Sequence, residues 1–231
     1  MAEPRPALSI ILPTLNEAAG VANALDALQD WRDAGVELIV ADGGSQDDTV
    51  ALAAPWVDHL VTAPRGRARQ MNAGAAIARA PVLLFLHADT RLPAGARQAI
   101  DAALGAGACW GRFDVRILGR HPMLAVVAWM MNHRSRLTGI ATGDQALFCT
   151  RAAFDAAGGY PDQPLMEDIA LSLALRRRAR PACLRQRVQT SGRRWETHGV
   201  WRTIALMWRL RAAYAFGADP VELARRYGYR P

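Results

Sequence analysis

The sequence predicts a three-layer α/β/α fold, in which helices cover both faces of a mostly parallel sheet and further helices extend the C-terminus. Patterns typical of strands and of helices alternate through the first half of the chain, as they do in strand–helix–strand units. The expected strands are also continuously apolar rather than alternating. Strands that are covered on both faces have this composition, which favours a parallel sheet.

Apolar runs and helical spacing mark the elements of the first half. Apolar side chains recur at helical spacing from Val21 to Trp31, and Gly35 is placed to end that helix. A short helix is expected to end at Pro55. The other expected elements are strands at 8–12, 36–41, 58–62 and 82–86 and a helix at 66–80.

The second half is less regular. A long and more exposed strand is expected at 108–118, and one long helix from Gly192 to Gly217, with a last short helix after Pro220. The elements between them are expected to be helices at 121–137 and 166–179 and strands at 145–150 and 184–190.

Length and composition indicate one globular domain. A chain of 231 residues, with 51% hydrophobic and 21% charged residues, can bury a single core. The net charge is +7, and all 28 basic side chains are arginine. A genome biased toward arginine codons explains this most simply, and the alternative is an anionic partner, either a phosphate-bearing substrate or an acidic membrane surface. We expect no nucleic-acid partner, because no basic helix carries base-reading residues.

The chain shows no targeting or membrane-spanning pattern. Residues 1–7 contain two prolines and lack an apolar core, and the apolar run at 124–131 is too short to cross a bilayer. We therefore expect a cytoplasmic protein, at most peripherally attached to the inner face of the membrane. Cys109, Cys149 and Cys183 lack metal-binding spacing and are expected to be reduced.

Polar clusters follow three of the expected strands. Pro13–Glu17 follows the first strand, Asp42–Thr49 the second, and His87–Thr90 the fourth. Taken singly, each cluster is explained by a turn or a helix cap. Because ligands bind beyond the carboxyl ends of parallel strands, the three clusters together favour a binding site at one edge of the sheet.

The chemistry of these clusters suits a nucleotide sugar. A diphosphate needs a hard divalent cation held by carboxylates, and Asp89 suits that role with Mg²⁺ or Mn²⁺. Such a metal would stabilise the charge that grows on the leaving nucleoside diphosphate. The Asp42 carboxylate could accept hydrogen bonds from the base or ribose. Arg65–Arg67, at an expected helix N-terminus, either contacts phosphate or is a solvated loop.

Several segments resemble the family 2 glycosyltransferases of GT-A fold, in that family's order and spacing. The segments are Ser9–Glu17, Val40–Thr49, Gly66–Ala75, Leu84–Thr90, the acidic motif Met166–Asp168 and the Arg-Trp element Ser191–Trp195. Glu196–Gly199 is similar to a small bacterial subgroup found beside radical-SAM genes. The resemblance implies a Rossmann-like GT-A domain over residues 1–231, with a nucleotide-sugar-binding half (1–106), an acceptor and catalytic half (107–190) and C-terminal helices (191–231).

The resemblance also implies a donor site. Its residues would be Pro13, Thr14, Asn16, Glu17, Asp42, Ser45, Asp47, Arg67, Asn72, His87, Ala88, Asp89, Arg194 and Trp195. His87 replaces the first aspartate of the family's D-x-D motif, so it either binds a softer metal or donates to the ribose, and the identity of the metal stays open. Ser191 replaces the family's glutamine before the Arg-Trp pair.

The catalytic base implied by the resemblance is Asp168, beside Glu167. It would take the proton from the acceptor hydroxyl as that oxygen attacks the anomeric carbon, and attack opposite the diphosphate would invert the centre. The same acidic pair would also suit the N-terminus of a helix. Gly143, Asp144 and Gln145 are expected to face the acceptor, an unidentified hydroxyl compound that is lipid-linked if the protein contacts a membrane.

Two other functions stay open. A nucleotide-sugar-binding protein without activity is favoured by His87. A sugar nucleotidyltransferase is disfavoured, because the first strand is not followed by a G-x-G-T-R loop and the chain has no lysine for phosphate. The apolar helix around residues 201–216 indicates core packing or a homodimer face.

Overall fold

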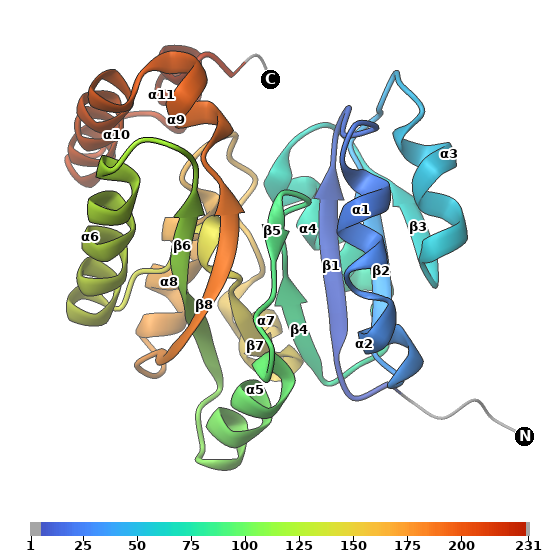
Figure 1. Ribbon diagram of the computed structural model, residues 1–231. Coiled ribbons are helices and arrows are strands. Elements are labelled where there is room, and N and C mark those ends of the chain that lie inside the picture. Colours follow the sequence, from blue (N-terminus) through green and yellow to red (C-terminus); the bar gives the residue numbers. More distant parts are fainter. Residues whose placement is uncertain (1–5, 230–231) are drawn as a thin grey trace, which may run out of the picture.

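The computed structural model describes residues 6–229, so Met1–Arg5 of the amino-terminal stretch considered above lie outside the described residues. Its centre is a curled eight-stranded sheet in the order β3-β2-β1-β4-β7-β6-β8-β5 (Figure 1). The strands are β1 (Ser9–Thr14), β2 (Glu37–Asp42), β3 (His59–Thr62), β4 (Val82–Phe85), β5 (Thr90–Arg91), β6 (Trp110–Leu118), β7 (Phe148–Thr150) and β8 (Ala182–Ser191).

The first four strands in the sheet are parallel, and the rest are mixed. β1 pairs in parallel with β2 and β4, and the register sets Thr14 beside Asp42 where both strands end. Ile10 and Leu12 enter the core on one face of the sheet and Ile11 the core on the other, because successive side chains of a strand alternate. β7 is antiparallel to β4 and β6, and β5 to β8, while β6 and β8 are parallel.

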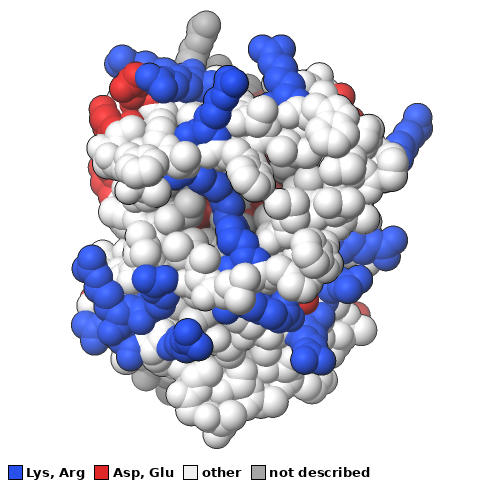
Figure 2. All heavy atoms as spheres, turned by 90° about the vertical axis from the view of Figure 1, so that its left-hand side faces the viewer, with Lys and Arg blue, Asp and Glu red and all other residues white. Residues whose placement is uncertain are grey.

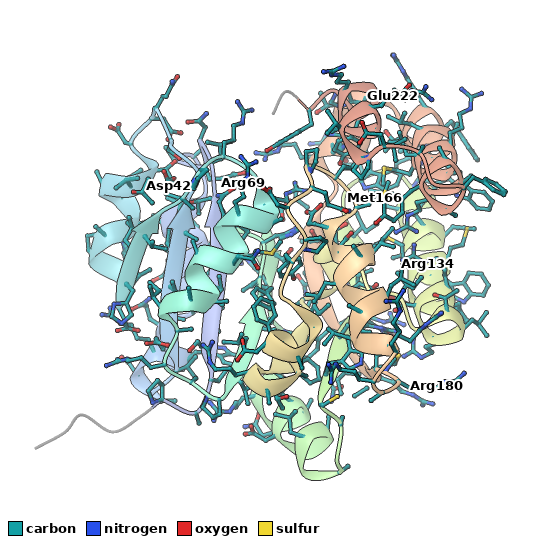
Figure 3. The ribbon with its side chains drawn as sticks, turned by 180° about the vertical axis from the view of Figure 1, so that it is seen from behind. Asp42, Arg69, Arg134, Met166, Arg180 and Glu222 are labelled. Atoms are coloured by element: carbon teal, nitrogen blue, oxygen red, sulfur yellow. The ribbon has the colours of Figure 1, made fainter. Side chains whose placement is uncertain are left out.

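Helices cover both faces of the sheet, so the predicted three-layer α/β/α class is confirmed. α4, α7 and α8 lie on the face turned toward the viewer in Figure 3, and α1, α2 and α6 lie on the side seen in Figure 1. The helices are α1 (Val21–Asp26), α2 (Gln29–Asp33), α3 (Thr49–Ala53), α4 (Arg67–Ile77), α5 (Ala96–Gly105), α6 (Met123–Thr138), α7 (Arg151–Ala157), α8 (Glu167–Arg176), α9 (Arg193–His198), α10 (Val200–Ala215) and α11 (Pro220–Tyr227), with short 3₁₀ turns at Ala54–Trp56 (η1) and Gly143–Gln145 (η2).

Two of the expected helices are each divided in two. The helix expected over 21–31 breaks at Leu28, where the chain leaves helical geometry with φ −108° and buries the leucine. The helix expected over 192–217 breaks at Gly199, whose φ of +83° and ψ of 132° only glycine adopts readily. α10 therefore starts in a new direction, set by the C-terminal cluster of Leu165, Met166, Ile169, Leu210, Leu223 and Ala224.

The strand expected over 108–118 was predicted to be more exposed, and this was wrong. The first six residues of β6 are buried because β7 and β8 flank it in the sheet and α6 packs on it. The strand expected over 145–150 begins only at Phe148, since Gly143–Gln145 form η2. The short β5 and the helices α5 and α7 were not expected from the sequence.

Within residues 6–229, none of the helices combines the length and apolar character needed to cross a bilayer.

Candidate functional site

A cavity of about 1250 Å³ opens where β1 and β4 end, under the C-terminal helices. Its walls come from the loops after β1 and β4, from the start of α4 and α8, and from α6, α9, α10 and α11. A cavity of this size at the carboxyl ends of parallel strands is the expected place for a ligand in an open α/β sheet.

Most of the residues predicted for a site line this cavity. They are Pro13, Thr14, Glu17, Arg67, His87, Ala88, Asp89, Gly143, Asp144, Glu167, Asp168, Arg194 and Trp195. Residues as far apart in the chain as Pro13 and Trp195 are thus brought together by the fold. The six predicted residues that do not line it are Asn16, Asp42, Ser45, Asp47, Asn72 and Gln145.

Asp42 uses its carboxylate to shape its own loop. Oδ2 accepts hydrogen bonds from the backbone N–H groups of Gly44 (2.9 Å) and Ser45 (2.8 Å), and Oδ1 accepts from the hydroxyls of Ser45 and Thr14. With both oxygens engaged and only 2% of the residue exposed, Asp42 fixes the end of β2. Figure 3 shows Asp42 well away from Met166, which lies at the cavity.

Asn16, Ser45 and Asp47 join the loop after β1 to the loop after β2. Asn16 has a left-handed φ of +54°, and its Oδ1 accepts from the N–H of Gln46 at 2.8 Å. The Ser45 hydroxyl accepts from the N–H of Asn16 (2.9 Å), and Asp47 accepts from that of Ala18 (3.2 Å). These contacts hold the loop Pro13–Glu17 against the loop that follows β2.

Asn72 and Gln145 lie beside the cavity wall. The Asn72 amide donates to the carbonyl of Tyr160 (2.8 Å) and accepts from its N–H (3.0 Å), which ties α4 to the segment before α8. Gln145 is fully buried and forms a capping box with Thr142 at η2. Both side chains therefore fix the backbone near the cavity.

Glu167 and Asp168 start α8 at the cavity. Met166 has a left-handed φ of +65°, which turns the chain so that both acids lie in the first turn of the helix. Asp168 Oδ2 accepts from the N–H of Gly143 at 2.8 Å and Oδ1 from that of Ile169 at 2.7 Å. Burial, together with the charge of Asp168, raises the pKa of Glu167 to about 7, and burial also raises the pKa of Asp168.

His87 connects the loop after β4 to η2. Its Nδ1 lies 3.6 Å from Asp144 Oδ1, and its ring packs on Gly143, where an added Cβ would come within 2.3 Å of the ring. Loss of solvent inside the cavity raises the pKa of Asp144, but the nearby His87 lowers it below the ordinary value. Loss of solvent likewise opposes the charge of Arg67, but Glu167 and other nearby acidic groups raise the pKa of Arg67 above the ordinary value.

Asp89 places one carboxylate in the cavity two residues after His87. Within residues 6–229 no group of three or more histidine, cysteine, aspartate and glutamate side chains could hold a metal by itself. A cation at Asp89 would therefore take its remaining ligands from a bound phosphate and water, which is usual for Mg²⁺.

The Arg-Trp element reaches the cavity through α9. The Arg194 guanidinium stacks on the Tyr227 ring, 3.6 Å from its centroid, and donates to the Tyr227 carbonyl at 2.9 Å. This contact ties α9 to α11. The neighbouring Arg193 lies 3.9 Å from Glu17, whose pKa burial raises.

The sequence did not indicate several lining residues. Gln70 is buried and donates to the carbonyls of Thr14 (2.6 Å) and Ala41 (2.9 Å), which joins the ends of β1 and β2. Arg134 of α6 and Arg211 of α10 also line the cavity. The sequence feature that could have indicated these two residues is an arginine within an apolar helical segment. This feature points to a binding site only when the two helices are known to face one cavity.

Comparisons with known proteins agree with this architecture. A model of the glycosyl transferase family 2 matches residues 9–150. An uncharacterized protein of Mycobacterium tuberculosis is 26% identical over an alignment of 198 residues, gaps included, that covers 74% of this chain and 62% of that protein. A PGL/p-HBAD biosynthesis glycosyltransferase of Mycobacterium bovis is 38% identical over 94 residues, 38% of this chain and 37% of that protein. The chain thus spans less than two thirds of either relative.

A solved structure extends the likeness to the C-terminal helices. The mannosyltransferase from Pyrobaculum calidifontis, in complex with GDP-Man and Mn²⁺, superposes with a TM-score of 0.64 at 19% identity and covers 97% of this chain and 70% of its own. At this identity the likeness shows the fold, which is of the GT-A type. Because the family model matches more than half of the sequence, the chain belongs to glycosyl transferase family 2.

Proposed function

We propose that this chain transfers a sugar from a nucleoside diphosphate sugar to a hydroxyl group of an acceptor, with inversion at the anomeric carbon. The observation that carries the proposal is the single cavity in which Asp89, Asp168 and the guanidinium of Arg67 meet. Glycosyl transfer needs a cationic environment for the diphosphate and a separate carboxylate for the acceptor proton. Family membership supports the same reaction class.

The donor would bind against the end of β1. Pro13, Thr14 and Glu17 line the cavity there, and Arg67 lines the same cavity from the N-terminus of α4. Backbone N–H groups at a helix N-terminus and a guanidinium both favour phosphate. Asp42, with Asn16, Ser45 and Asp47, would contribute by fixing the two loops, because their side chains bond to the loops themselves.

The residues present fit a divalent metal that is shared with the donor. Asp89 would hold it, and His87, which lines the same cavity, would bind either the metal or the ribose. When bound, Mg²⁺ or Mn²⁺ supplies positive charge that stabilises the leaving nucleoside diphosphate. The mannosyltransferase with the same fold was solved with GDP-Man and Mn²⁺, which supports both the donor class and the metal.

Asp168 would act as the general base. Two backbone N–H groups orient its carboxylate, and burial raises its pKa. A carboxylate with a raised pKa holds a proton more tightly, which suits the removal of a proton from a hydroxyl near neutral pH. Attack from the side of Asp168, opposite the diphosphate, would invert the anomeric centre. Gly143 and Asp144 would face the acceptor.

Glu167 would support this base by accepting a proton itself. With its pKa at about 7, Glu167 is partly protonated near neutral pH, so the adjacent pair need not carry two full negative charges.

The segment Glu196–Gly199 is the basis for placing the chain in the small bacterial subgroup found beside radical-SAM genes.

The test is turnover of UDP- and GDP-sugars with Mn²⁺ or Mg²⁺, measured as release of the nucleoside diphosphate. Asp168→Asn should leave donor binding intact and lower turnover by at least ~10²-fold. Asp89→Ala should abolish metal-dependent donor binding, measured by thermal shift. Asp101→Asn is the matched control, because Asp101 is an exposed residue of α5 paired with Arg97, outside the cavity.

Two outcomes would contradict the proposal. Turnover of the Asp168→Asn protein at the wild-type rate would remove Asp168 from the mechanism. Tight binding of sugar nucleotides without any release of nucleoside diphosphate, with water or with any acceptor, would show a binding protein instead.

A further inference from the structure

We propose that the acceptor is an anionic amphiphile, whose apolar chain lies between α6 and α10 and whose negative group pairs with Arg134 and Arg211. This inference rests on the proposed function and names the substrate class of the same cavity. Its basis is the half of the cavity that the donor and the catalytic carboxylates leave unused.

Apolar side chains form that half of the cavity. Met123, Val127 and Met131 of α6 and Ile204, Met207 and Trp208 of α10 all line it. Methionine side chains are flexible and adapt to chains of varied shape. A sugar or a nucleotide has little apolar surface to bury here, whereas an alkyl chain gains free energy from every methylene that it removes from water.

Three guanidinium nitrogens of two half-buried arginines in this apolar half are buried without partners. Nε and Nη2 of Arg134 and Nε of Arg211 are buried and lack a hydrogen-bond partner among the described residues. Burial lowers the pKa of Arg134, although the charge of Asp168 opposes this. Unpaired buried charges are costly in a folded protein, and an incoming anion would remove the cost by accepting these hydrogen bonds.

The surface of the same two helices around the cavity is apolar as well, and Trp201 and Trp208 lie both in the cavity wall and at this surface. On α6, Val126 and Trp129 are 43% and 59% exposed, and on α10 Trp201 and Trp208 are 65% and 63% exposed. Trp201 and Trp208 are seven residues apart and share one side of the helix. Large exposed apolar patches on a protein surface mark interaction sites.

The charge around this face complements an anion. Figure 2 shows this side of the molecule, where arginine side chains lie around and within a broad uncharged surface and few acidic groups are visible. Arg202 and Arg209 of α10 are exposed, and the whole chain carries a net charge of +7. A lipid with a negative headgroup therefore matches the face in both its apolar and its charged parts.

The groove is continuous with the catalytic end. Asp168 and Met207 line the same cavity, so an acceptor that holds its chain between α6 and α10 could present a hydroxyl to Asp168. The class of acceptor is therefore a compound with an alkyl or prenyl-like chain, a phosphate or carboxylate, and a free hydroxyl near that charge.

The test uses dodecyl phosphate below its micelle concentration, with inorganic phosphate and dodecyl maltoside as separate arms. Binding is followed by the fluorescence of the tryptophans that line the cavity. We expect dodecyl phosphate to bind at least about tenfold more tightly than either other compound, because only dodecyl phosphate satisfies the apolar groove and the arginines together. Arg134→Gln and Arg211→Gln should each weaken it about tenfold, whereas Arg177→Gln, at an exposed arginine just after α8 and outside the cavity, should not.

Equal binding of dodecyl maltoside and dodecyl phosphate to the wild-type protein would overturn the anionic part of the inference, and this comparison does not depend on any variant. Binding of inorganic phosphate as tightly as dodecyl phosphate would overturn the apolar part. Donor binding is measured in parallel with a UDP- or GDP-sugar and Mn²⁺. Its absence would contradict the proposed function, while amphiphile binding would be judged separately from it.

Discussion

Replacing Glu167 by glutamine should stabilise the protein above neutral pH. The pKa of Glu167 rises from an ordinary 4.5 to about 7 in the folded protein, because of its burial and the charge of Asp168. A carboxyl group with a raised pKa in the folded state binds its proton more tightly there than in the unfolded chain. Glu167 therefore contributes most to the free energy of unfolding below pH 4.5, and this contribution is lost as the pH rises from 4.5 toward 7.

The size of the effect follows from the pKa. Each tenfold change in proton affinity corresponds to about 1.4 kcal/mol, so ionising Glu167 in the folded protein costs up to about 3 kcal/mol. Glutamine has nearly the shape of the protonated side chain and never ionises. The free energy of unfolding of Glu167→Gln should match that of the wild type near pH 4.5 and exceed it by about 2 to 3 kcal/mol at pH 8.

Urea denaturation of both proteins between pH 4.5 and pH 8 measures this difference. Comparison at each pH cancels the contributions of the other titrating groups. A constant difference across the range, or a variant that is less stable at pH 8, would refute the reasoning, because either result means that Glu167 ionises freely in the folded protein.

Three further substitutions have distinct expected results. Glu37→Gln should show the opposite pH dependence. Burial raises the pKa of Glu37, but hydrogen bonds from Ser9 and Arg79 outweigh burial and lower that pKa. The free energy of unfolding of the variant should therefore be about 2 kcal/mol below that of the wild type at pH 7, and the difference should shrink as the pH falls below 4.5, measured in the same urea series. Gly74→Ala should cost about 1 to 3 kcal/mol, since its Cβ would lie 2.5 Å from Ile11 Cγ2, while Gly105→Ala, with open space at the end of α5, should cost nothing. Gly143→Ala should displace His87 and lower turnover about tenfold or more with little change in melting temperature, and an unaltered rate would show that the position of His87 is unimportant.

The first half of the fold could be predicted because its information is local. β1, β2 and β4 are continuous apolar runs, and each is followed by a polar cluster, so both the parallel sheet and the edge of the cavity follow from the sequence. The register that sets Thr14 beside Asp42 was not predicted and is seen only in the structure. The acidic pair at the start of α8 was found only through its place in the family order, because the dipeptide alone also suits a helix N-terminus.

The second half could not be predicted in the same way because tertiary contacts decide it. The antiparallel placement of β7 between β4 and β6 depends on pairing between distant segments, which no local pattern shows. Gly199 lies within a helical pattern and breaks it, since its left-handed φ is required by the packing of α10 and not by its neighbours in sequence. Asp42 was expected to contact a ligand, and only the coordinates show that its own loop occupies both carboxylate oxygens.

The donor end of the cavity and its α10 wall differ in how they relate to the family model. The family model ends at residue 150, whereas the fold of the mannosyltransferase covers 97% of the chain. The backbone beyond residue 150 is therefore shared with that structure although the family model does not extend to it. On the proposed function, the donor end, with Arg67 and Asp89, lies inside the matched region, and the wall containing Arg211 and Met207 lies outside it. An enzyme that keeps one donor chemistry and changes its acceptor needs this division, because substitutions in α10 can alter the acceptor groove without moving the groups that hold the diphosphate.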